Sequence, residues 1–310
     1  MRQPNFFILG APKCGTTSLA RWLADHPQVY MSPVKEPHYY STDLANRTIR
    51  SQKRYEALFR AARYEHRAIG EASTWYLFSK DAIPAIENAH PEARYIVMTR
   101  DPVGMAHSLY HHNCRVLHED QPTFEAAWCL QADRAVGQSL PRFCTEPSFL
   151  QYKAACSLGS LLDRLYAQVP DSRVLHVPLE WVRSDPAAQY RRILAFLGLD
   201  DDERKAFPVA NEARGHRSPL AQRILRLGGR VRIALGFNRG LGLAKLNERA
   251  RQKPILSREF QLELEQTFEE ERSRLNRFIE RASVLDREIR LRGHVVSDAF
   301  GNDQSRLGGE

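Results

Sequence analysis

The sequence predicts an α/β fold of three layers, in which helices cover both faces of a central, mostly parallel sheet. Short apolar runs typical of buried strands alternate along the chain with segments that have helical spacing, as in parallel sheets covered on both sides. One such run ends in a glycine-bearing turn that opens a helix, an arrangement that binds phosphate. The 310 residues, 43% of them hydrophobic and 26% charged, suffice for one large domain.

The expected strands are short apolar runs. The first, 5–10 (NFFILG), ends at Gly10, and a glycine after an apolar run is a common end of a strand. The other runs that we expect to form strands are 29–31, 68–72, 95–99 and 174–177.

The expected helices show apolar residues at helical spacing together with end signals. Pro102 stands where a helix would begin, Gly198 where one would end, and Ser257 with Glu259 makes a plausible start. The segments expected to be helical are 16–26, 81–89, 102–117, 124–135, 149–168, 186–197 and 257–279.

We expect a single domain over 1–295 and a disordered tail over 296–310, which is polar and glycine-rich. No stretch approaches the roughly 18–20 apolar residues of a membrane-spanning helix, and the apolar run 6–11 is too short for a signal peptide. The five cysteines are odd in number and form no CxxC pair, which argues against a disulfide framework and a zinc site. We therefore expect a soluble, cytoplasmic protein without a metal.

The positive charge of the chain is concentrated in one segment. The net charge is +8, yet residues 214–254 contain eleven basic residues and one acid, Glu248. Within this segment, residues 220–235 carry an apolar stripe at helical spacing, so a basic helical insert or lid is expected over about 212–254. Such a segment suits an anionic partner, either an acidic acceptor, nucleic acid or an acidic membrane surface. A solvated basic face on a pair of helices is the simpler alternative.

The loop after the first strand, GAPKCGTTSL, differs from the loop of nucleotide triphosphatases. Gly10 and Gly15 have the separation of the GxxxxGK[ST] motif, but Thr16 stands where the lysine belongs, and the lysine is Lys13. No apolar run ends in a convincing magnesium-binding Asp. The loop predicts an anion site and disfavours an ATP-dependent kinase, which is the second interpretation.

Two elements of the sequence resemble sulfotransferases that use 3′-phosphoadenosine 5′-phosphosulfate (PAPS), above all the bacterial and heparan-type carbohydrate sulfotransferases. PKCGTTSL is similar to their 5′-phosphosulfate loop. TRDPVGMAHSLY is similar to their 3′-phosphate element, in which an Arg and a Ser eight residues later hold the phosphate. The resemblance implies a P-loop sulfotransferase fold with PAPS as cofactor and 3′,5′-adenosine bisphosphate as product. The cofactor-binding residues it implies are Lys13, Cys14, Gly15, Thr16, Thr17, Ser18, Arg100 and Ser108.

Sulfuryl transfer requires in-line geometry, charge stabilisation and a base for the hydroxyl proton. Lys13 is placed to neutralise the bridging oxygen of the leaving nucleotide. The segment VKEPHYYS offers Glu36 and His38, and it resembles the heparan-type segment whose Glu before an aromatic pair acts as base. The resemblance favours Glu36, whose simpler role would be an ion pair with Lys35. His38 is the rival base because its ordinary pKa is closer to neutrality.

The next segment, GEASTWYLF, resembles the part of these enzymes that lines the acceptor site. The resemblance suggests that Glu71 binds acceptor hydroxyls and that Trp75 and Tyr76 stack on sugar rings; pairing with an Arg and core packing are the alternatives. The heparan-type enzymes carry a Lys after the Glu, and this chain has Ala72 there, which puts a second catalytic lysine in doubt.

A later loop, NEARGHRSP, resembles the flexible clamp on the 3′-phosphate and adenine. Within it Arg217 and Ser218 fit best, with Arg214 and Gly215 less secure.

The leading interpretation is a sulfotransferase that moves sulfate from PAPS to a hydroxyl of a carbohydrate, glycolipid or small metabolite, without a metal. A non-catalytic basic protein that binds nucleic acid or membrane is the third interpretation, and it leaves Lys13, Arg100 and Ser108 without a purpose. We expect no nucleic-acid partner. The identity of the acceptor, O- versus N-sulfation and the oligomeric state are not encoded in any motif.

Overall fold

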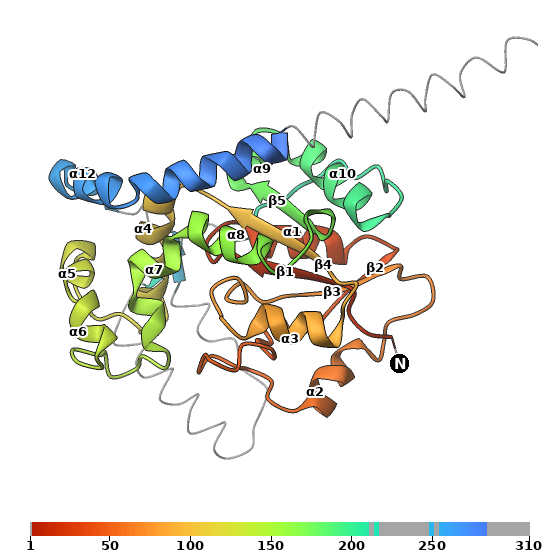
Figure 1. Ribbon diagram of the computed structural model, residues 1–310, viewed down its shortest axis with the longest axis horizontal. Coiled ribbons are helices and arrows are strands. Elements are labelled where there is room, and N and C mark those ends of the chain that lie inside the picture. Colours follow the sequence, from red (N-terminus) through yellow and green to blue (C-terminus); the bar gives the residue numbers. More distant parts are fainter. Residues whose placement is uncertain (1, 211–213, 217–247, 251–253, 284–310) are drawn as a thin grey trace, which may run out of the picture.

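The computed structural model describes residues 2–210, 214–216, 248–250 and 254–283. Its centre is a five-stranded sheet in the order β2-β3-β1-β4-β5, with every neighbouring pair parallel (Figure 1). The strands are β1 (Phe6–Gly10), β2 (Val29–Met31), β3 (Ala68–Ala72), β4 (Arg94–Thr99) and β5 (Val174–Pro178). The expected parallel α/β sheet and its five strands are confirmed.

The central strand β1 is buried on both faces. Phe6, Phe7, Ile8 and Leu9 are all fully inaccessible to solvent, which is why this strand is a continuous apolar run without alternation. Gly70 on the neighbouring strand makes room for the Phe6 ring, because a Cβ there would lie 2.4 Å from two ring carbons. The close contact between β1 and β3 therefore depends on a residue without a side chain.

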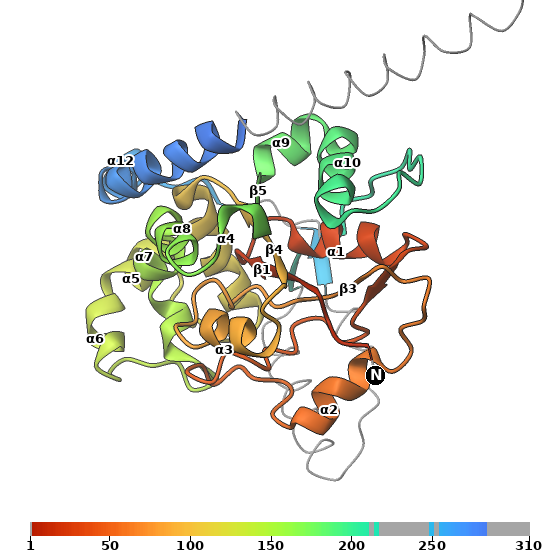
Figure 2. The same cartoon turned by 45° about the vertical axis from the view of Figure 1, so that its right-hand side comes forward.

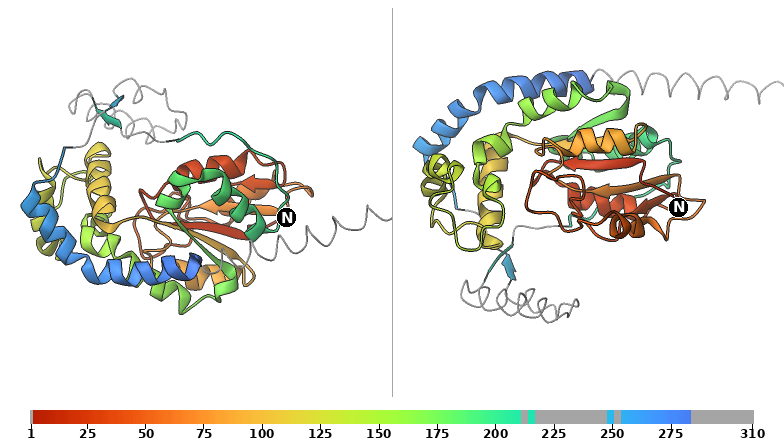
Figure 3. Two further views of the ribbon diagram at one scale, coloured as in Figure 1. Left: turned by 90° about the horizontal axis from the view of Figure 1, so that it is seen from above. Right: turned by 60° about the horizontal axis from the view of Figure 1, so that its bottom comes forward.

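Helices cover both faces of the sheet. The helices α1 (Thr16–Ala24) and α10 (Pro186–Leu197) lie side by side (Figures 1 and 2), and the Tyr190 hydroxyl of α10 donates to the Trp22 carbonyl of α1 over 3.4 Å. The helix α3 (Ala82–Ala89) lies on the opposite face from α1 (Figure 3). The helix α8 (Leu158–Tyr166) is hydrogen-bonded to the segment that precedes α3, because Arg164 of α8 donates to the carbonyls of Leu77 and Phe78.

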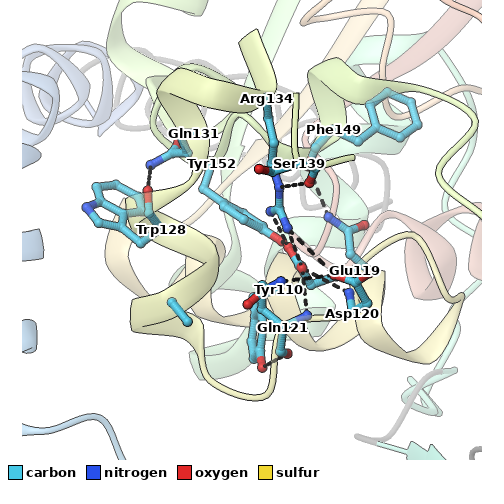
Figure 4. A network of polar contacts seen from close by, with 12 residues as sticks. Tyr110, Glu119, Asp120, Gln121, Trp128, Gln131, Arg134, Ser139, Phe149 and Tyr152 are labelled. Carbon is cyan, nitrogen blue, oxygen red and sulfur yellow. Dashed lines mark hydrogen bonds and ion pairs between the residues drawn. The ribbon is translucent and has the colours of Figure 1, made fainter. Parts of the chain in front are cut away.

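Short helices gather beside α4 (Pro102–Arg115) at one side of the sheet. They are α5 (Phe124–Cys129), α6 (Gln131–Ala135), the 3-10 turn η2 (Pro147–Leu150) and α7 (Tyr152–Cys156). Figure 4 shows the ion pair that joins them: Arg134 and Glu119, both completely buried, bond over 2.6 and 2.8 Å. The Tyr152 hydroxyl also donates to Glu119 over 2.8 Å, so one buried carboxylate links three segments.

Three expected long helices are interrupted, and the third of them, 257–279, breaks at Phe268. The segment 124–135 divides at Leu130 into α5 and α6, and the segment 149–168 consists of the end of η2 followed by α7 and α8. Gln151 and Ser157 have ψ near 71° and 62°, outside the helical range. These turns let α7 and α8 bury different apolar faces. Further short elements that were not anticipated are α2 (Gln52–Glu56), η1 (Ala57–Phe59), η3 (Asp171–Arg173) and α9 (Leu179–Ser184).

The C-terminal helix begins where the sequence indicates. The Ser257 hydroxyl accepts the Phe260 N–H over 3.3 Å and caps α12 (Arg258–Thr267). After an interruption at Phe268, residues 269–283 are again helical and run across the molecule towards α9 (Figure 1). Phe278 stacks on Tyr166 of α8 with ring centroids 5.1 Å apart, which fixes this helix over α8.

The basic segment 214–254 is described only in part. The strands β6 (Arg214–His216) and β7 (Glu248–Ala250) pair antiparallel. The expected apolar stripe at 220–235, the cofactor candidates Arg217 and Ser218, and the tail 296–310 lie outside the described residues. Within the part that is described, no helix has the length and apolar character needed to cross a bilayer.

Candidate active site

The candidate site is assembled from segments that come directly after four adjacent parallel strands. Lys13 comes after β1, Glu36 after β2, residues 73–76 after β3, and Arg100 after β4. The carboxyl ends of parallel strands meet at one edge of a sheet, where open α/β proteins bind their ligands. The topology therefore brings together residues that are distant in the sequence.

The loop between β1 and α1 has the backbone of an anion-binding turn. Gly10, Lys13 and Gly15 have φ values of 145°, 67° and 90°, a region in which glycine is favoured. A Cβ on Gly15 would lie 2.9 Å from Cδ1 of Leu179, so packing as well as backbone conformation requires glycine there. No described side chain caps α1, which leaves the N–H groups of Thr16 and Thr17 at its start available to an anion, while the Ser18 N–H donates to the Gly15 carbonyl over 3.0 Å.

The other predicted loop residues differ in what their side chains offer. Cys14 is fully buried with its sulfur 3.9 Å from that of Met105, and burial raises the pKa of its thiol to about 12. It can contribute only backbone groups to a ligand. The Ser18 hydroxyl accepts the Ala210 N–H over 3.0 Å, so it holds the segment that leads towards β6. Thr16 is buried and Thr17 is half-buried.

Arg100 lies against the loop between β1 and α1 (residues 10–15), hereafter the cofactor loop because the sequence predicts that it binds the cofactor. Its Nη1 donates to the Lys13 carbonyl over 3.3 Å, while its Nε is buried without a hydrogen-bond partner among the described residues. Gly104 permits this position, because a Cβ there would approach Nη2 of Arg100 to 3.0 Å. Ser108 is buried on α4, and Asp101 caps that helix by accepting the Gly104 N–H over 2.8 Å. The two motifs of the sequence thus converge in space.

Glu36 is held by bonds from three residues. Its carboxylate accepts the Thr74 N–H over 2.7 Å and the Thr74 hydroxyl over 3.1 Å. It also pairs with Lys35 and lies 3.0 Å from Nε2 of His38. Burial would raise the pKa of Glu36, but the bond from His38 and the charges of Lys35 and His38 outweigh it and lower that pKa to about 2. The carboxylate is therefore ionised at every pH at which the protein would work.

Glu36 and His38 differ in access to solvent. The side chain of Glu36 is 30% exposed and that of His38 is 6% exposed. Nδ1 of His38 is buried without a hydrogen-bond partner among the described residues. The imidazole therefore contacts the site through Glu36, whose side chain is the more exposed of the two.

Thr74 connects Glu36 to the cofactor loop. Its carbonyl oxygen lies 2.5 Å from the position that a Cβ on Gly10 would occupy, while its N–H holds the Glu36 carboxylate. Gly10 is thus needed for the close approach of the two segments. Neither role was anticipated from the sequence.

His112 is a further residue that sequence reasoning missed. Burial, followed by the charges of Lys13 and Arg115, lowers its pKa to about 3, while the charge of Glu36 acts in the opposite direction. An Arg115 N–H donates to Nδ1 over 3.3 Å, so the neutral ring carries its proton on Nε2. The one available signal was its place one helical turn after Ser108.

Glu71, Trp75 and Tyr76 lie beneath the site, in the core. The Glu71 carboxylate is fully buried and accepts hydroxyl hydrogen bonds from Tyr55, Ser73 and Tyr76. Trp75 is 7% exposed and stacks on Phe149 with ring centroids 3.7 Å apart, and Tyr76 is fully buried. Of the alternatives open for the two rings, core packing is the one that the structure shows.

A parallel α/β sheet with a glycine loop and an open helix start at its carboxyl edge, beside an arginine, is typical of α/β proteins that bind phosphate groups. A family model described as the sulfotransferase domain matches residues 3–210. The chain belongs to this family.

Similar proteins agree with this assignment. A sulfotransferase structure from Alicyclobacillus acidocaldarius is 30% identical with a TM-score of 0.60, and the alignment covers 79% of this chain and 100% of that one. The membrane-associated sulfotransferase kil1 of Dictyostelium discoideum is 30% identical over 38% of this chain and 25% of its own length. Heparan sulfate glucosamine 3-O-sulfotransferase 3B1 of Mus musculus is 26% identical over 70% of this chain and 54% of its own. The chain spans a quarter to about half of these two curated relatives.

Proposed function

We propose that this protein transfers the sulfuryl group of PAPS to a hydroxyl of a carbohydrate, glycolipid or small-metabolite acceptor. The observation that supports this most is the convergence of the Lys13 loop, Arg100 and Glu36 at one edge of the sheet. Sulfuryl transfer requires an anion site, positive charge beside it and a base for the acceptor hydroxyl. The loop offers the anion site, Lys13 and Arg100 the positive charge, and the partly exposed side chain of Glu36 the base.

The residues present fit the cofactor. The first turn of α1 and the Lys13 side chain would hold the 5′-phosphosulfate, with Thr16 and Thr17 adding hydroxyl groups. Arg100 and Ser108 would hold the 3′-phosphate, and the buried Nε of Arg100 without a described partner is a donor that such a phosphate would satisfy. When bound, PAPS supplies the sulfuryl group and a bisphosphate that leaves.

Glu36 is the base that we propose. Its carboxylate would accept the proton of the acceptor hydroxyl as that hydroxyl takes up the sulfuryl group that bound PAPS supplies. Lys13 would stabilise the negative charge left on the departing bisphosphate. The exposure of Glu36 and the burial of His38 support this assignment over His38 as the group that meets the acceptor. The neutral His112 would add a hydrogen-bond donor beside Lys13.

Carbohydrates are the first acceptors to examine. The curated relatives include carbohydrate and heparan sulfate sulfotransferases, and their names describe those proteins rather than this one. A polysaccharide, a glycolipid and a small phenol or alcohol therefore form the appropriate panel.

Calorimetric titration with 3′,5′-adenosine bisphosphate, beside ATP with magnesium, tests the cofactor. We expect micromolar binding of the bisphosphate that Lys13→Ala and Arg100→Ala each weaken by roughly tenfold or more, the loss of one charge-assisted contact. Lys53→Ala, at an exposed lysine on α2, is the matched control and leaves binding unchanged. Preference for ATP with magnesium would assign the protein to the kinases and contradict the proposal.

Transfer from radiolabelled PAPS to desulfated heparan, a glycolipid and a phenol tests the reaction. We expect Glu36→Gln to reduce kcat by roughly 10²–10⁴-fold, the usual contribution of a general base, while bisphosphate binding is retained. An unchanged kcat in this variant would exclude Glu36 as the base.

A further inference from the structure

A buried carboxylate lies under the segment that carries Glu36 and His38. Glu71, fully inaccessible to solvent, accepts hydrogen bonds from the hydroxyls of Ser73 over 2.7 Å, Tyr55 over 2.8 Å and Tyr76 over 2.9 Å. A carboxylate out of contact with water is costly unless several donors satisfy it. Packing alone does not explain why a carboxylate with three hydroxyl donors is buried at this position.

Two of the three hydroxyls also contact the backbone of the overlying segment. The Ser73 hydroxyl accepts the His38 N–H over 3.1 Å, and the Tyr76 hydroxyl accepts the Tyr40 N–H over 3.2 Å. Each hydroxyl has one proton, so donating it to Glu71 directs its lone pairs at the N–H above. Among the described contacts, the Tyr55 hydroxyl bonds Glu71 but no backbone N–H of residues 36–40.

The overlying segment needs such support because its backbone is strained. Glu36 and His38 have φ values of 60° and 51°, in the left-handed region that is unfavourable for a residue with a side chain. A conformation of this kind persists only where surrounding contacts impose it. The hydroxyls of Ser73 and Tyr76 bond the N–H groups at and just after the strained positions.

We propose that Glu71 is a positioning residue, which fixes residues 36–40, and with them the carboxylate of Glu36, through the hydroxyls of Ser73 and Tyr76. The inference deepens the proposed function, because it rests on Glu36 as the base. It replaces the expectation that Glu71 binds acceptor hydroxyls, since the carboxylate faces the core.

The ionisation of Glu71 gives this network a pH dependence. Burial raises its pKa to about 6, although the hydroxyls of Ser73, Tyr55 and Tyr76 act to lower it. Above that pH the carboxylate accepts all three bonds. Below it the protonated acid must donate one bond, so one hydroxyl turns to accept that bond and gives its own proton to another acceptor, which disturbs the geometry of the network under residues 36–40. Besides Tyr55 and Tyr76, the titratable groups Tyr40 and His38 interact with Glu71, and Glu36 stays ionised throughout this range.

Amide hydrogen exchange on the full chain tests the network without reference to catalysis. We expect Tyr76→Phe to accelerate exchange at Tyr40 and Ser73→Ala to accelerate it at His38, each by roughly tenfold for one lost hydrogen bond. Tyr55→Phe is the matched control, because it removes a bond to the same carboxylate and leaves both amides protected. Equal acceleration by all three variants, or by none, would overturn the proposal.

Kinetics with PAPS and a desulfated heparan acceptor give the second readout. We expect Glu71→Gln to lower kcat by roughly tenfold, as for a small misplacement of a catalytic group, with bisphosphate affinity within about twofold. The acid limb of kcat near pH 6 should disappear in Glu71→Gln and persist in His38→Gln. A limb that depends on His38 instead would overturn the proposal. Wild-type protein without transfer activity would contradict the proposed function, while amide exchange in Glu71→Gln still decides the role of Glu71: faster exchange at His38 and Tyr40 supports it and unchanged exchange overturns it.

Discussion

Gly15 serves the backbone and the packing of the cofactor loop at the same time. Its φ of 90° favours glycine, and a Cβ would collide with Leu179 of α9 at 2.9 Å. Gly137 offers a comparison, since its φ is 82° and nothing lies within 4 Å of the Cβ it lacks. A comparison of Gly15 with Gly137 therefore separates the free-energy cost of a left-handed backbone from the cost of a steric clash with Leu179.

We expect Gly137→Ala to reduce the free energy of unfolding by about 1 kcal/mol, the cost of the backbone conformation. Gly15→Ala should lose more and should also weaken binding of 3′,5′-adenosine bisphosphate, because α9 must move away from the loop. Urea unfolding and calorimetric titration measure the two effects. Equal losses in the two variants, with binding unchanged, would show that the contact with Leu179 carries no weight.

Glu36 and Glu71 affect stability with opposite dependence on pH. The pKa of Glu36 is lowered from 4.5 to about 2, so its contribution is present above pH 4.5 and is lost as the pH falls towards 2. The pKa of Glu71 is raised from 4.5 to about 6. The folded state then binds its proton more tightly, and stability decreases as the pH rises from 4.5 through 6.

Unfolding of wild type and Glu71→Gln between pH 4 and 7 checks this sign. Wild type should lose up to about 2 kcal/mol relative to the variant as Glu71 ionises, which is the shift in pKa converted to free energy. The difference between the two proteins should be constant above about pH 7. A difference that changes in the other direction would mean that the hydroxyl bonds outweigh burial at Glu71.

At the scale of elements, the buried pair Arg134–Glu119 joins the short helices beside α4. Both side chains are inaccessible, and Tyr152 of α7 also donates to Glu119 (Figure 4). Removal of one partner leaves an uncompensated buried charge, which costs far more than the pair contributes.

We expect Arg134→Met to lose about 3–5 kcal/mol of unfolding free energy. The double variant Glu119→Gln/Arg134→Met should be more stable than that single variant, because the amide oxygen still accepts from Tyr152 and no charge is stranded. Arg183→Met, at an exposed pair with Glu180, is the control and should change stability by less than about 0.5 kcal/mol. A double variant less stable than Arg134→Met would contradict this account.

The helical elements also show the limit of local pattern. Pro102, Gly198 and Ser257 mark helix ends correctly because each acts through its own backbone or a cap within one turn. The breaks at Leu130 and Ser157 carry no such signal. They arise because the segments on either side pack against different partners.

At the scale of the molecule, the charge of residues 214–254 is a property of the sequence, and we propose that it attracts an anionic acceptor. Arg223, Arg226 and Arg230 changed together to Ala should raise the KM for a sulfated or carboxylated acceptor more than the KM for PAPS, with a weaker dependence on salt. The charge-matched control changes Lys53, Arg54 and Arg60, which are exposed around α2. An unchanged KM for the acceptor would contradict this proposal.

The single domain over 1–295 and the cytoplasmic location stay predictions.

The sequence by itself determined the sheet, and it located the two elements for which we predict anion binding. Five apolar runs, the glycine loop with Lys13, and Arg100 before a capped helix are local signals, and parallel topology places the loops after such strands at one edge of the sheet. These signals depend on the conformation of a few neighbouring residues. They can therefore be recognised without knowledge of contacts between distant parts of the chain.

Only the tertiary structure decided what each polar and aromatic side chain faces. The sequence predicts that Glu36 is the base and that Glu71 binds acceptor hydroxyls, but no pattern shows that one is partly exposed with a lowered pKa and the other is buried with a raised pKa. Trp75 and Tyr76 belong to the core because Phe149 and Glu71 contact them. Burial is set by segments that approach from far along the chain, and no local pattern encodes it.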